Sequence, residues 1–379
     1  MNRPLDPKNV GRLLIRGTNW VGDAVMSLPA LKQVRREFSQ AQITLLVVPW
    51  VSGVYEECEY IDKIIQYERQ GKHGGVRGKI RLVREVRQRD FDAALFFQNA
   101  FEAAFLAWLS GIRFRAGYDR DGRKWLLTHS IRVDPRIRRL HQCYYYLDLV
   151  DQLLGRNRTA LQSVKPGHYA NSLFLPLEDI TIPVGPSRKE AARQKLRQSG
   201  TPLQKKLVGV NPGAYFGSAK RWLSDRFAEL LDRLIERENA GVVIFGASNE
   251  LQIAESVQSH MRCRPVILSG KTSLAELIAM ISVCDLFITN DSGPMHLAAA
   301  LCVPTLAIFG PTDENATGPM SPTAVLVKKK VECSPCLLRE CPIDHRCMTR
   351  ISVDDVYVQA VEMLRTAPGR GPSHAEDAG

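Results

Sequence analysis

Short apolar segments alternate with longer amphipathic ones along nearly the whole chain, and this rhythm constrains the fold more than any other feature. Strands are expected at 12–16, 43–48, 92–97, 207–210, 242–245, 285–289 and 305–309, and helices at 24–38, 224–238, 251–261 and 273–283. Ser273 and Glu276 form a Ser-x-x-Glu capping box for the last helix. Because the strands are almost continuous Val, Ile and Leu, helices must cover both faces of each sheet. The sequence therefore predicts an α/β fold built on parallel sheets.

The rhythm is interrupted by one proline- and glycine-rich stretch, 175–187, which contains Pro176, Pro183, Gly185 and Pro186. We interpret it as a linker between two doubly wound domains, 1–180 and 181–350, which are followed by a helix at 351–366 and a disordered tail at 367–379. In such domains ligands bind beyond the carboxyl ends of the strands, so candidate site residues are sought in the turns that follow strands. A second glycine-rich stretch, 71–78, is expected to be a mobile loop.

Charge and composition limit the class of protein. The 51 Lys and Arg residues exceed the 40 Asp and Glu residues by 11. This excess suits an anionic partner, such as nucleic acid, an anionic membrane face or a phosphorylated substrate, and a merely basic soluble surface explains it equally well. The first residues form no apolar signal-peptide core, and the longest nearly apolar run, 297–309, is too short to span a bilayer. With nine cysteines and no export signal, we expect free thiols and a cytoplasmic location.

The first candidate site follows the first expected strand, in the segment 16–24. Gly17 and Gly22 have the spacing of two P-loop glycines, but Asp23 and Ala24 stand where Lys and Ser or Thr are needed. A carboxylate there would repel the phosphate, and the spacing is not that of Gly-x-Gly-x-x-Gly either. The turn therefore presents Asp23 at the carboxyl edge of the sheet, either as a helix cap stabilised by the dipole or as a catalytic base.

The second candidate site is the segment 211–222, after the first expected strand of the second half. Gly213 and Gly217 allow backbone amides to approach a ligand closely, while Ser218 supplies a hydroxyl. Lys220 and Arg221 supply positive charge. This combination suits a pyrophosphate, with an ordinary surface turn as the alternative.

The third candidate site is the segment 289–300. Pro294 after Gly293 is expected at the first position of a new helix, whose free amides and positive dipole end would form a second anion site. His296 lies in the first turn and can donate a hydrogen bond to a phosphate or sugar oxygen. A structural histidine is the alternative.

Taken together, these segments resemble the glycosyltransferase family that contains the bacterial ADP-heptose:lipopolysaccharide heptosyltransferases, glycosyltransferase family 9. The resemblance runs from about 12 to 364 and rests on the Trp-Val-Gly-Asp of 20–23, the 211–222 segment, Gly-Ala-Ser-Asn-Glu at 246–250 and Asn-Asp-Ser-Gly-Pro-Met-His at 290–296. Trp20, Phe216 and the cysteine cluster near the C-terminus resemble the heptosyltransferase II branch. The resemblance implies a GT-B fold, with two Rossmann-like domains that face each other across a cleft. It implies that the N-terminal domain binds the acceptor and the C-terminal domain binds the nucleotide-sugar.

The resemblance also implies the site residues. Asp23 corresponds to the general base, Lys220 to a diphosphate-binding lysine and Asp291 to a carboxylate near the donor sugar. The donor-binding set is Ser218, Lys220, Glu250 on the ribose, Thr272 near the adenine, Asp291, Ser292, Gly293 and His296. The implied reaction is inverting transfer of heptose from ADP-L-glycero-D-manno-heptose to the heptosyl-Kdo2-lipid A inner core of lipopolysaccharide. The alternative is a related transferase of the same family, of the heptosyltransferase I or III type, with another acceptor position or donor sugar. No Asp-x-Asp motif lies near these segments, and we expect no metal and no cofactor.

Nine Lys and Arg residues against three acids lie between Ile112 and His141. In an acceptor domain they would bind phosphates and sugar-acid carboxylates, or dock the protein as a peripheral protein on the anionic cytoplasmic face of the inner membrane. A solvated basic face is the alternative. The acceptor-binding candidates are Arg120, Arg123, Lys124, Arg136, Arg138 and Arg139.

Four cysteines cluster near the C-terminus, at Cys333, Cys336, Cys341 and Cys347, with His345 among them. Their number suits a zinc or iron–sulfur site, but their spacing fits neither the paired Cys-x2-Cys zinc pattern nor common ferredoxin runs. We expect free thiols or a locally stapled loop, with a metal as the alternative. A nucleic-acid-binding protein would use the basic segment and this cluster, but it leaves three phosphate-suited turns unexplained, so no nucleic-acid partner is expected.

Overall fold

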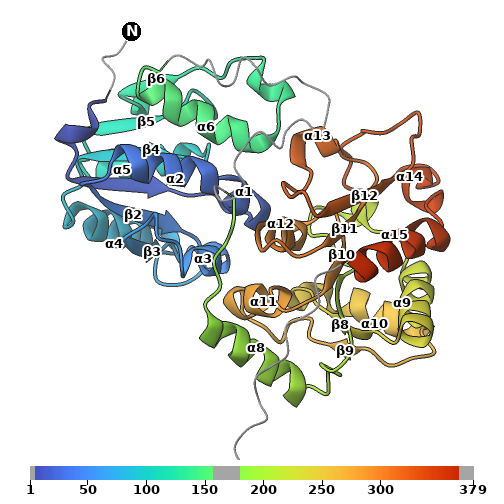
Figure 1. The fold of residues 1–379 in the computed structure, drawn as a ribbon. Helices are drawn as coiled ribbons and strands as arrows, with labels where there is room; N and C mark the ends of the chain where they lie inside the picture. The colour runs from blue at the N-terminus through green and yellow to red at the C-terminus, as the bar shows by residue number, and fades with distance from the viewer. Residues whose placement is uncertain (1–4, 157–179, 367–379) are drawn as a thin grey trace, which may run out of the picture. The chain divides into compact units, whose positions relative to one another are not determined.

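The computed structural model describes residues 5–156 and 180–366 of the 379-residue chain (Figure 1). The first part of the expected linker, up to 179, and the expected disordered tail, 367–379, lie outside the described residues. Contacts divide the chain into two compact units. Unit 1 comprises 1–183 with 273–278 and 313–322, and unit 2 comprises 184–272, 279–312 and 323–379.

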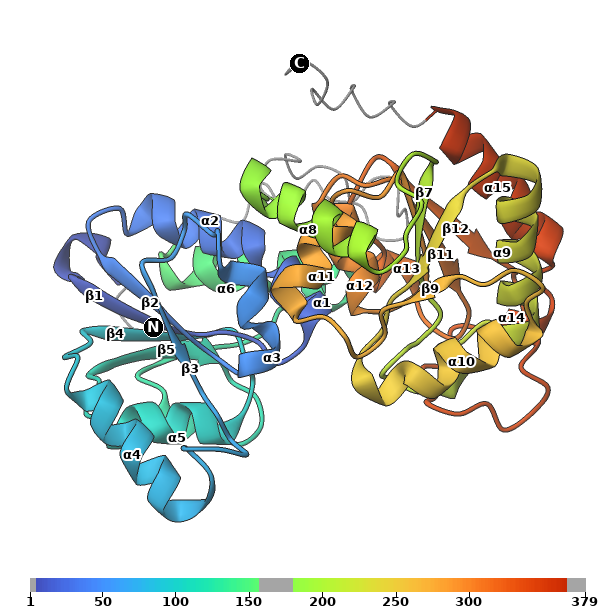
Figure 2. The same cartoon turned by 90° about the horizontal axis from the view of Figure 1, so that it is seen from below.

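Unit 1 contains a six-stranded parallel sheet with the order β3-β2-β1-β4-β5-β6, formed by β1 (Arg12–Arg16), β2 (Gln42–Val47), β3 (Lys63–Gln66), β4 (Ala93–Phe96), β5 (Phe114–Tyr118) and β6 (His129–Ile131). Helices α2 (Leu28–Glu37) and α6 (Gln142–Leu153) pack together on one face of the sheet. Helices α4 (Gly75–Arg87) and α5 (Phe101–Leu109) pack on the other face (Figure 2). Two short helices, α1 (Val21–Met26) and α3 (Pro49–Ser52), follow β1 and β2.

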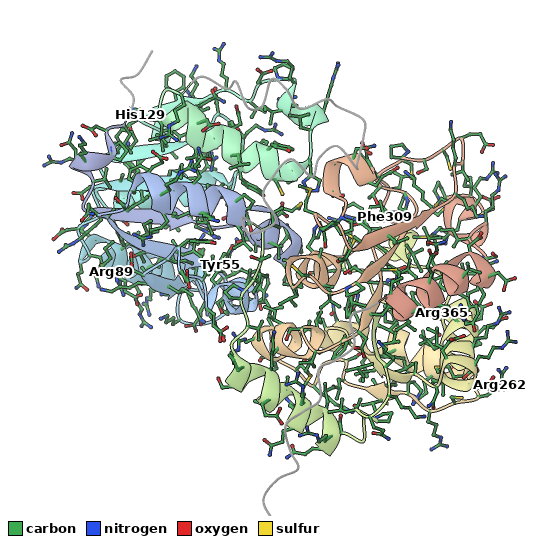
Figure 3. The ribbon with its side chains drawn as sticks, in the orientation of Figure 1. Tyr55, Arg89, His129, Arg262, Phe309 and Arg365 are labelled. Carbon is green, nitrogen blue, oxygen red and sulfur yellow. The ribbon has the colours of Figure 1, made fainter. Side chains whose placement is uncertain are left out.

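Unit 2 contains a second six-stranded parallel sheet with the order β12-β11-β10-β7-β8-β9, formed by β7 (Leu207–Asn211), β8 (Gly241–Ile244), β9 (Val266–Ile267), β10 (Leu286–Asn290), β11 (Thr305–Phe309) and β12 (Ala324–Lys328). One face is covered by α9 (Ser224–Glu238), α10 (Leu251–His260) and α15 (Val353–Thr366). On the other face, α12 (Gly293–Ala300) packs Met295 against Phe309, which is labelled in Figure 3. Of the other described helices, α8 (Pro186–Gln198) and α14 (Arg346–Thr349) belong to unit 2, α13 (Glu314–Thr317) belongs to unit 1, and α11 (Leu274–Ile281) is divided between the two units.

Both sheets have the strand order of the dinucleotide-binding Rossmann fold, in which the first strand of each unit is central and the order reverses beside it. The expected α/β class and parallel sheets are therefore confirmed. The capping box is confirmed as well: the Ser273 amide donates to Glu276 Oε2 at 2.8 Å, and the Glu276 amide donates to Ser273 Oγ at 3.2 Å. In the part of the chain that the structure describes, no helix is long and apolar enough to cross a membrane.

Two local expectations were wrong. The helix expected over 24–38 is two helices, α1 and α2, separated at Ser27, because Pro29 has no amide hydrogen and fits only the first turn of a helix. The glycine-rich stretch 71–78 is no extended loop, since α4 begins at Gly75. A side chain at Gly78 would collide with the His73 backbone, so that glycine is required by close packing.

Candidate active site

Asp23 lies in the first turn of α1, directly beyond the carboxyl end of β1. Its partly buried carboxylate accepts a hydrogen bond from the hydroxyl of Tyr146, at 2.8 Å from Oδ1. Trp20 occupies the N-cap position, so Asp23 is not the capping residue, although it is the acid of the first turn, where the helix dipole favours a carboxylate. Burial raises the pKa of Asp23, and the hydrogen bond from Tyr146 opposes that rise. A carboxyl group with a raised pKa at a strand end is suited to accept a proton.

The turn that carries Asp23 is fixed by the buried side chain of Arg16, the last residue of β1. This guanidinium donates to the Leu46 carbonyl at 3.1 Å and to Asn19 Oδ1 at 2.7 Å. The Trp50 indole donates to the Asn19 carbonyl at 2.8 Å. Gly17 is required here because a Cβ atom would lie 2.6 Å from Val47 Cγ1. Asp23 is therefore presented by a rigid turn.

Lys220 and Asp291 form the centre of the candidate site in unit 2. Lys220 Nζ lies 2.6 Å from Asp291 Oδ2, and the Thr312 hydroxyl donates to the same oxygen at 2.6 Å. Asp291 is only 4% exposed, so the ion pair is largely shielded from water. The ammonium also lies 5.0 Å from the centre of the Phe216 ring. The segments that follow β7 and β10 thus bring the opposite charges of Lys220 and Asp291 together, and the segment that follows β11 adds Thr312.

The start of α12 adjoins this pair. The helix begins at Gly293 with Ser292 as its N-cap, so Pro294 is its second residue, one position later than expected. Ser292 Oγ accepts a hydrogen bond from Asn211 Nδ2 at 3.3 Å and lies 3.1 Å from Thr289 Oγ1. Asn211 Oδ1 is buried without a hydrogen-bond partner among the described residues. His296 is buried within the first turn.

Glu250 lies beside the turn that follows β7. Its Oε2 accepts a hydrogen bond from the Ala247 amide at 2.9 Å, and a side chain at Gly213 would collide with its carboxylate. Gly213 is therefore required for the two turns to meet. The nearby Ser269 hydroxyl is buried and has no hydrogen-bond partner among the described side chains.

The two remaining donor-site expectations are peripheral to this cluster. Ser218 is exposed at the start of a 3-10 helix (Ser218–Lys220), and Thr272 is half-buried just before α11. Within 5–156 and 180–366, no hydrogen bond joins either side chain to the Lys220–Asp291 pair.

Arg123 was expected to bind the acceptor, and the structure contradicts this expectation. Its side chain is fully buried and donates to the carbonyls of Tyr118 and Gln98 and to Asn99 Oδ1, so an external anion cannot reach it. The other candidates are exposed: Arg120, Lys124, Arg136, Arg138 and Arg139. Arg136 is already paired with Asp134, at 2.9 Å.

The four clustered cysteines are free thiols, as are the other five, so the stapled-loop alternative is wrong. Burial raises the pKa of Cys347 to about 11, and the three other clustered cysteines add to the rise. In the described ranges no group of three or more His, Cys, Asp or Glu side chains is arranged to hold a metal ion. The same segment supports Lys220: the Ala219 amide donates to the Arg339 carbonyl at 2.9 Å, and His345 Nε2 lies 2.7 Å from the Ala219 carbonyl.

Three residues of the site were not predicted from the sequence: Thr312, Asn211 and Tyr146. Thr312 follows β11 by three positions, so the strand-end rule that located the other turns could have found it. Asn211 lies within a recognised segment, but its contact with Ser292 depends on β7 and β10 being neighbours. Tyr146 is 123 positions from Asp23 on a helix, and no local pattern indicates their contact.

The chain is similar to a set of characterised bacterial enzymes. A family model described as glycosyltransferase family 9 (heptosyltransferase) matches residues 79–346. Lipooligosaccharide heptosyltransferase 2 of Campylobacter jejuni is 29% identical over 362 residues, which are 94% of this chain and 99% of that protein. Lipopolysaccharide heptosyltransferase 2 of Escherichia coli is 29% identical over 84% of this chain and 88% of that protein.

Solved structures agree with the fold. The structure of E. coli ADP-heptose lipopolysaccharide heptosyltransferase II matches with a TM-score of 0.77 and 25% identity, over 93% of this chain and 98% of that one. A family 9 glycosyltransferase from Veillonella parvula matches with a TM-score of 0.79 and 24% identity, over 96% of this chain and 99% of that one. At that identity the match supports the fold and nothing further. The GT-B class expected from the resemblance is thereby confirmed.

Proposed function

The chain belongs to glycosyltransferase family 9, and from that premise we propose that it transfers heptose from ADP-L-glycero-D-manno-heptose to heptosyl-Kdo2-lipid A, with inversion at the sugar carbon. The named relatives at 29% identity are heptosyltransferase 2 enzymes and cover most of the chain. The single observation in the structure that supports this function best is the shielded Lys220–Asp291 pair beside the start of α12.

On the donor side, the diphosphate is proposed to bind between Lys220 and the amides at Ser292 and Gly293. A helix start offers free amides and a positive dipole end, which stabilise negative charge. As ADP departs, its charge grows, and the fixed ammonium of Lys220 stabilises it. Asp291 holds that ammonium in place at 2.6 Å and has its second contact from Thr312, so the cation is positioned before the donor binds.

The nucleoside half of the donor is proposed to lie toward Glu250. The carboxylate is held by the Ala247 amide against Gly213, where no side chain blocks the approach of a ribose. Carboxylates accept hydrogen bonds from ribose hydroxyls in Rossmann-like domains. The unpartnered Asn211 Oδ1 and Ser269 Oγ supply two further polar atoms in the same unit.

On the acceptor side, Asp23 is proposed to be the general base. The attacking hydroxyl must lose its proton as it bonds to the anomeric carbon, and a positioned carboxylate can accept that proton. The rigid turn and the Tyr146 hydrogen bond fix the carboxylate, and burial raises its pKa. Burial raises the pKa of Tyr145, and the positive charges of the exposed Arg120 and Arg138 oppose that rise. Positive charge therefore lies close to Tyr145, the neighbour of Tyr146 in the chain.

The acceptor is a lipid, so we also propose a cytoplasmic protein in peripheral contact with the inner membrane. The net positive charge of 11 favours an anionic leaflet.

A donor and acceptor panel tests the function. Purified protein is incubated with ADP-heptose or other nucleotide-sugars and with Kdo2-lipid A or heptosyl-Kdo2-lipid A, and products are identified by mass spectrometry. We expect one heptose added to heptosyl-Kdo2-lipid A. Transfer to Kdo2-lipid A alone would indicate the heptosyltransferase I type instead.

A further inference from the structure

Helix α5 exposes an aromatic face to solvent. Phe101, Phe105 and Trp108 are 49%, 37% and 50% exposed, and they recur at the spacing of one helix face. Their rings stack in series, with centroid distances of 5.9 Å for each successive pair. The opposite face of the helix is packed in the core of unit 1. Three stacked, exposed aromatic rings on one short helix indicate a binding surface rather than scattered apolar residues.

The aromatic face continues onto the neighbouring elements. The 3-10 helix Lys124–Leu126 packs against α5 through Leu126 and leaves Trp125 90% exposed. On α4, beside α5 (Figures 1 and 2), Val76 and Ile80 are also exposed. We call Phe101, Phe105, Trp108 and Trp125 the aromatic ridge.

Positive charge flanks the aromatic ridge. Helix α4 contains Arg77, Lys79, Arg81, Arg84 and Arg87, all exposed, against a single acid, Glu85. The only acid on α5, Glu102, is paired with Lys79 at 2.6 Å, and Lys124 Nζ lies 6.0 Å from the Trp125 ring. The surface around the aromatic ridge therefore has a net positive charge. In a symmetric dimer formed through the ridge, the positive surfaces of the two copies would face each other, and their repulsion disfavours self-association.

The aromatic ridge begins at the edge of the sheet that carries Asp23. Helix α5 follows the carboxyl end of β4, and Phe97, between them, packs on Tyr146 at 5.5 Å. Tyr146 is the residue that holds Asp23. A bilayer against α4 and α5 would thus adjoin the edge of the unit where the acceptor is expected.

We propose that the aromatic ridge and the basic face of α4 form the surface that docks unit 1 on an anionic lipid bilayer. The occupant is inferred from chemistry: Trp and Phe side chains settle at the level of lipid headgroups, while Lys and Arg attract anionic phosphates. This inference rests on the proposed function, because a membrane-embedded acceptor gives the docking its purpose. It assigns the contact to α4 and α5 rather than to the basic segment between Ile112 and His141 alone.

Flotation with lipid vesicles tests the surface. The full-length protein is mixed with vesicles of phosphatidylethanolamine and phosphatidylglycerol, or of phosphatidylcholine alone. The test variants are Phe105→Ser with Trp108→Ser, and Arg77→Glu with Arg84→Glu. The matched controls lie in unit 2: Val358→Ser, an exposed apolar residue of α15, and Arg237→Glu with Arg264→Glu, an exposed basic pair.

We expect the wild type to float with the anionic vesicles and not with phosphatidylcholine. Each test pair should weaken that partition on the order of tenfold or more, and the controls should not. Circular dichroism of the variants verifies that they are folded. Equal flotation of folded test variants and wild type would overturn the proposal. A wild-type dimer that the serine variant converts to a monomer, without vesicle binding, would assign the ridge to a second copy and overturn it as well.

A comparison of two acceptors separates this proposal from the function it rests on. With acceptor embedded in anionic vesicles, the turnover of the variant Phe105→Ser with Trp108→Ser should fall at least tenfold. With a deacylated, soluble acceptor, its turnover should stay within about twofold of that of the wild type. If the variant loses turnover equally on both acceptors, the ridge acts in the reaction rather than in docking and the proposal is wrong. If the wild type transfers heptose to neither acceptor but binds anionic vesicles through the ridge, the proposed function fails and the docking surface stands.

Discussion

The hydroxyl of Tyr146 donates a hydrogen bond to Asp23 Oδ1 at 2.8 Å, which links a helix late in unit 1 to the first turn after β1. Tyr146 is buried, its ring packs against Phe97, and both burial and the adjacent carboxylate raise the pKa of its hydroxyl. The hydroxyl therefore remains a donor throughout the working pH range. This bond is the clearest indication in the structure that the orientation of Asp23 is controlled.

Replacement of Asp23 tests its proposed role as the base. Asp23→Asn keeps the shape and an oxygen that can accept from Tyr146, but it cannot take a proton at neutral pH. Turnover should fall by roughly 10²–10⁴-fold, with the affinity for ADP little changed. Steady-state kinetics and calorimetry with ADP measure the two quantities. Near-native turnover of the Asn variant would contradict the assignment.

Tyr146→Phe should move the pH profile rather than abolish turnover. The Tyr146 hydroxyl stabilises the charged form of Asp23 and so lowers its pKa against the effect of burial. Its removal raises that pKa further, so the acidic limb of kcat/KM should shift to higher pH by about 1–2 units, the equivalent of one hydrogen bond to a charged group.

The matched control is Tyr145→Phe, whose hydroxyl accepts a hydrogen bond from Asn99 at 2.8 Å instead. It should leave the acidic limb in place. An acidic limb that is the same in Tyr146→Phe and wild type would mean that Asp23 is not the group that titrates.

Lys220→Ala should weaken ADP binding by about 1.5–3 kcal/mol, the range for a hydrogen bond to a charged group, and should slow turnover further. His296→Ala should weaken binding less, because the amides of α12 remain. Calorimetry with ADP on both variants measures this. Unchanged affinity in Lys220→Ala would place the diphosphate elsewhere.

The same substitution should also destabilise the fold. Asp291 is buried, and without Lys220 its carboxylate keeps, among the side chains of 5–156 and 180–366, the hydrogen bond from Thr312. Loss of one partner of a buried pair costs about 3–5 kcal/mol, and the double variant Lys220→Ala with Asp291→Asn should recover part of that loss. Denaturant unfolding of the two variants checks the coupling. A double variant less stable than Lys220→Ala would show that the pair is not coupled in this way.

The cysteine segment should matter through its backbone rather than its thiols. Cys333→Ser with Cys336→Ser should keep turnover within about twofold, and elemental analysis should find well under one zinc or iron per chain. A stoichiometric metal whose removal unfolds the protein would contradict this prediction.

Gly217→Ala should impair ADP binding, because the added Cβ atom would collide with the Arg339 carbonyl and displace the turn that ends at Lys220.

The fold could be predicted because buried strands such as β8 and β11 are largely apolar runs, and because helices such as α9 carry apolar residues at helical spacing. Five strands were missed. Four of them, β3, β6, β9 and β12, lie at the edges of the sheets, and the fifth, β5, has the mixed sequence Phe-Arg-Ala-Gly-Tyr. Such strands are set by their neighbours rather than by their own pattern. Arg123 was misjudged for a similar reason, since composition cannot show that a charged residue in a basic run is buried.

Transfer of heptose tests the proposed function most directly. Wild-type protein and Asp23→Asn are incubated with ADP-L-glycero-D-manno-heptose and heptosyl-Kdo2-lipid A, and the acceptor is followed by mass spectrometry. We predict that wild type adds one heptose and releases ADP, and that Asp23→Asn adds it at least roughly 10²-fold more slowly. No transfer from ADP-heptose by wild type, with efficient transfer from a different nucleotide-sugar, would contradict the proposed function.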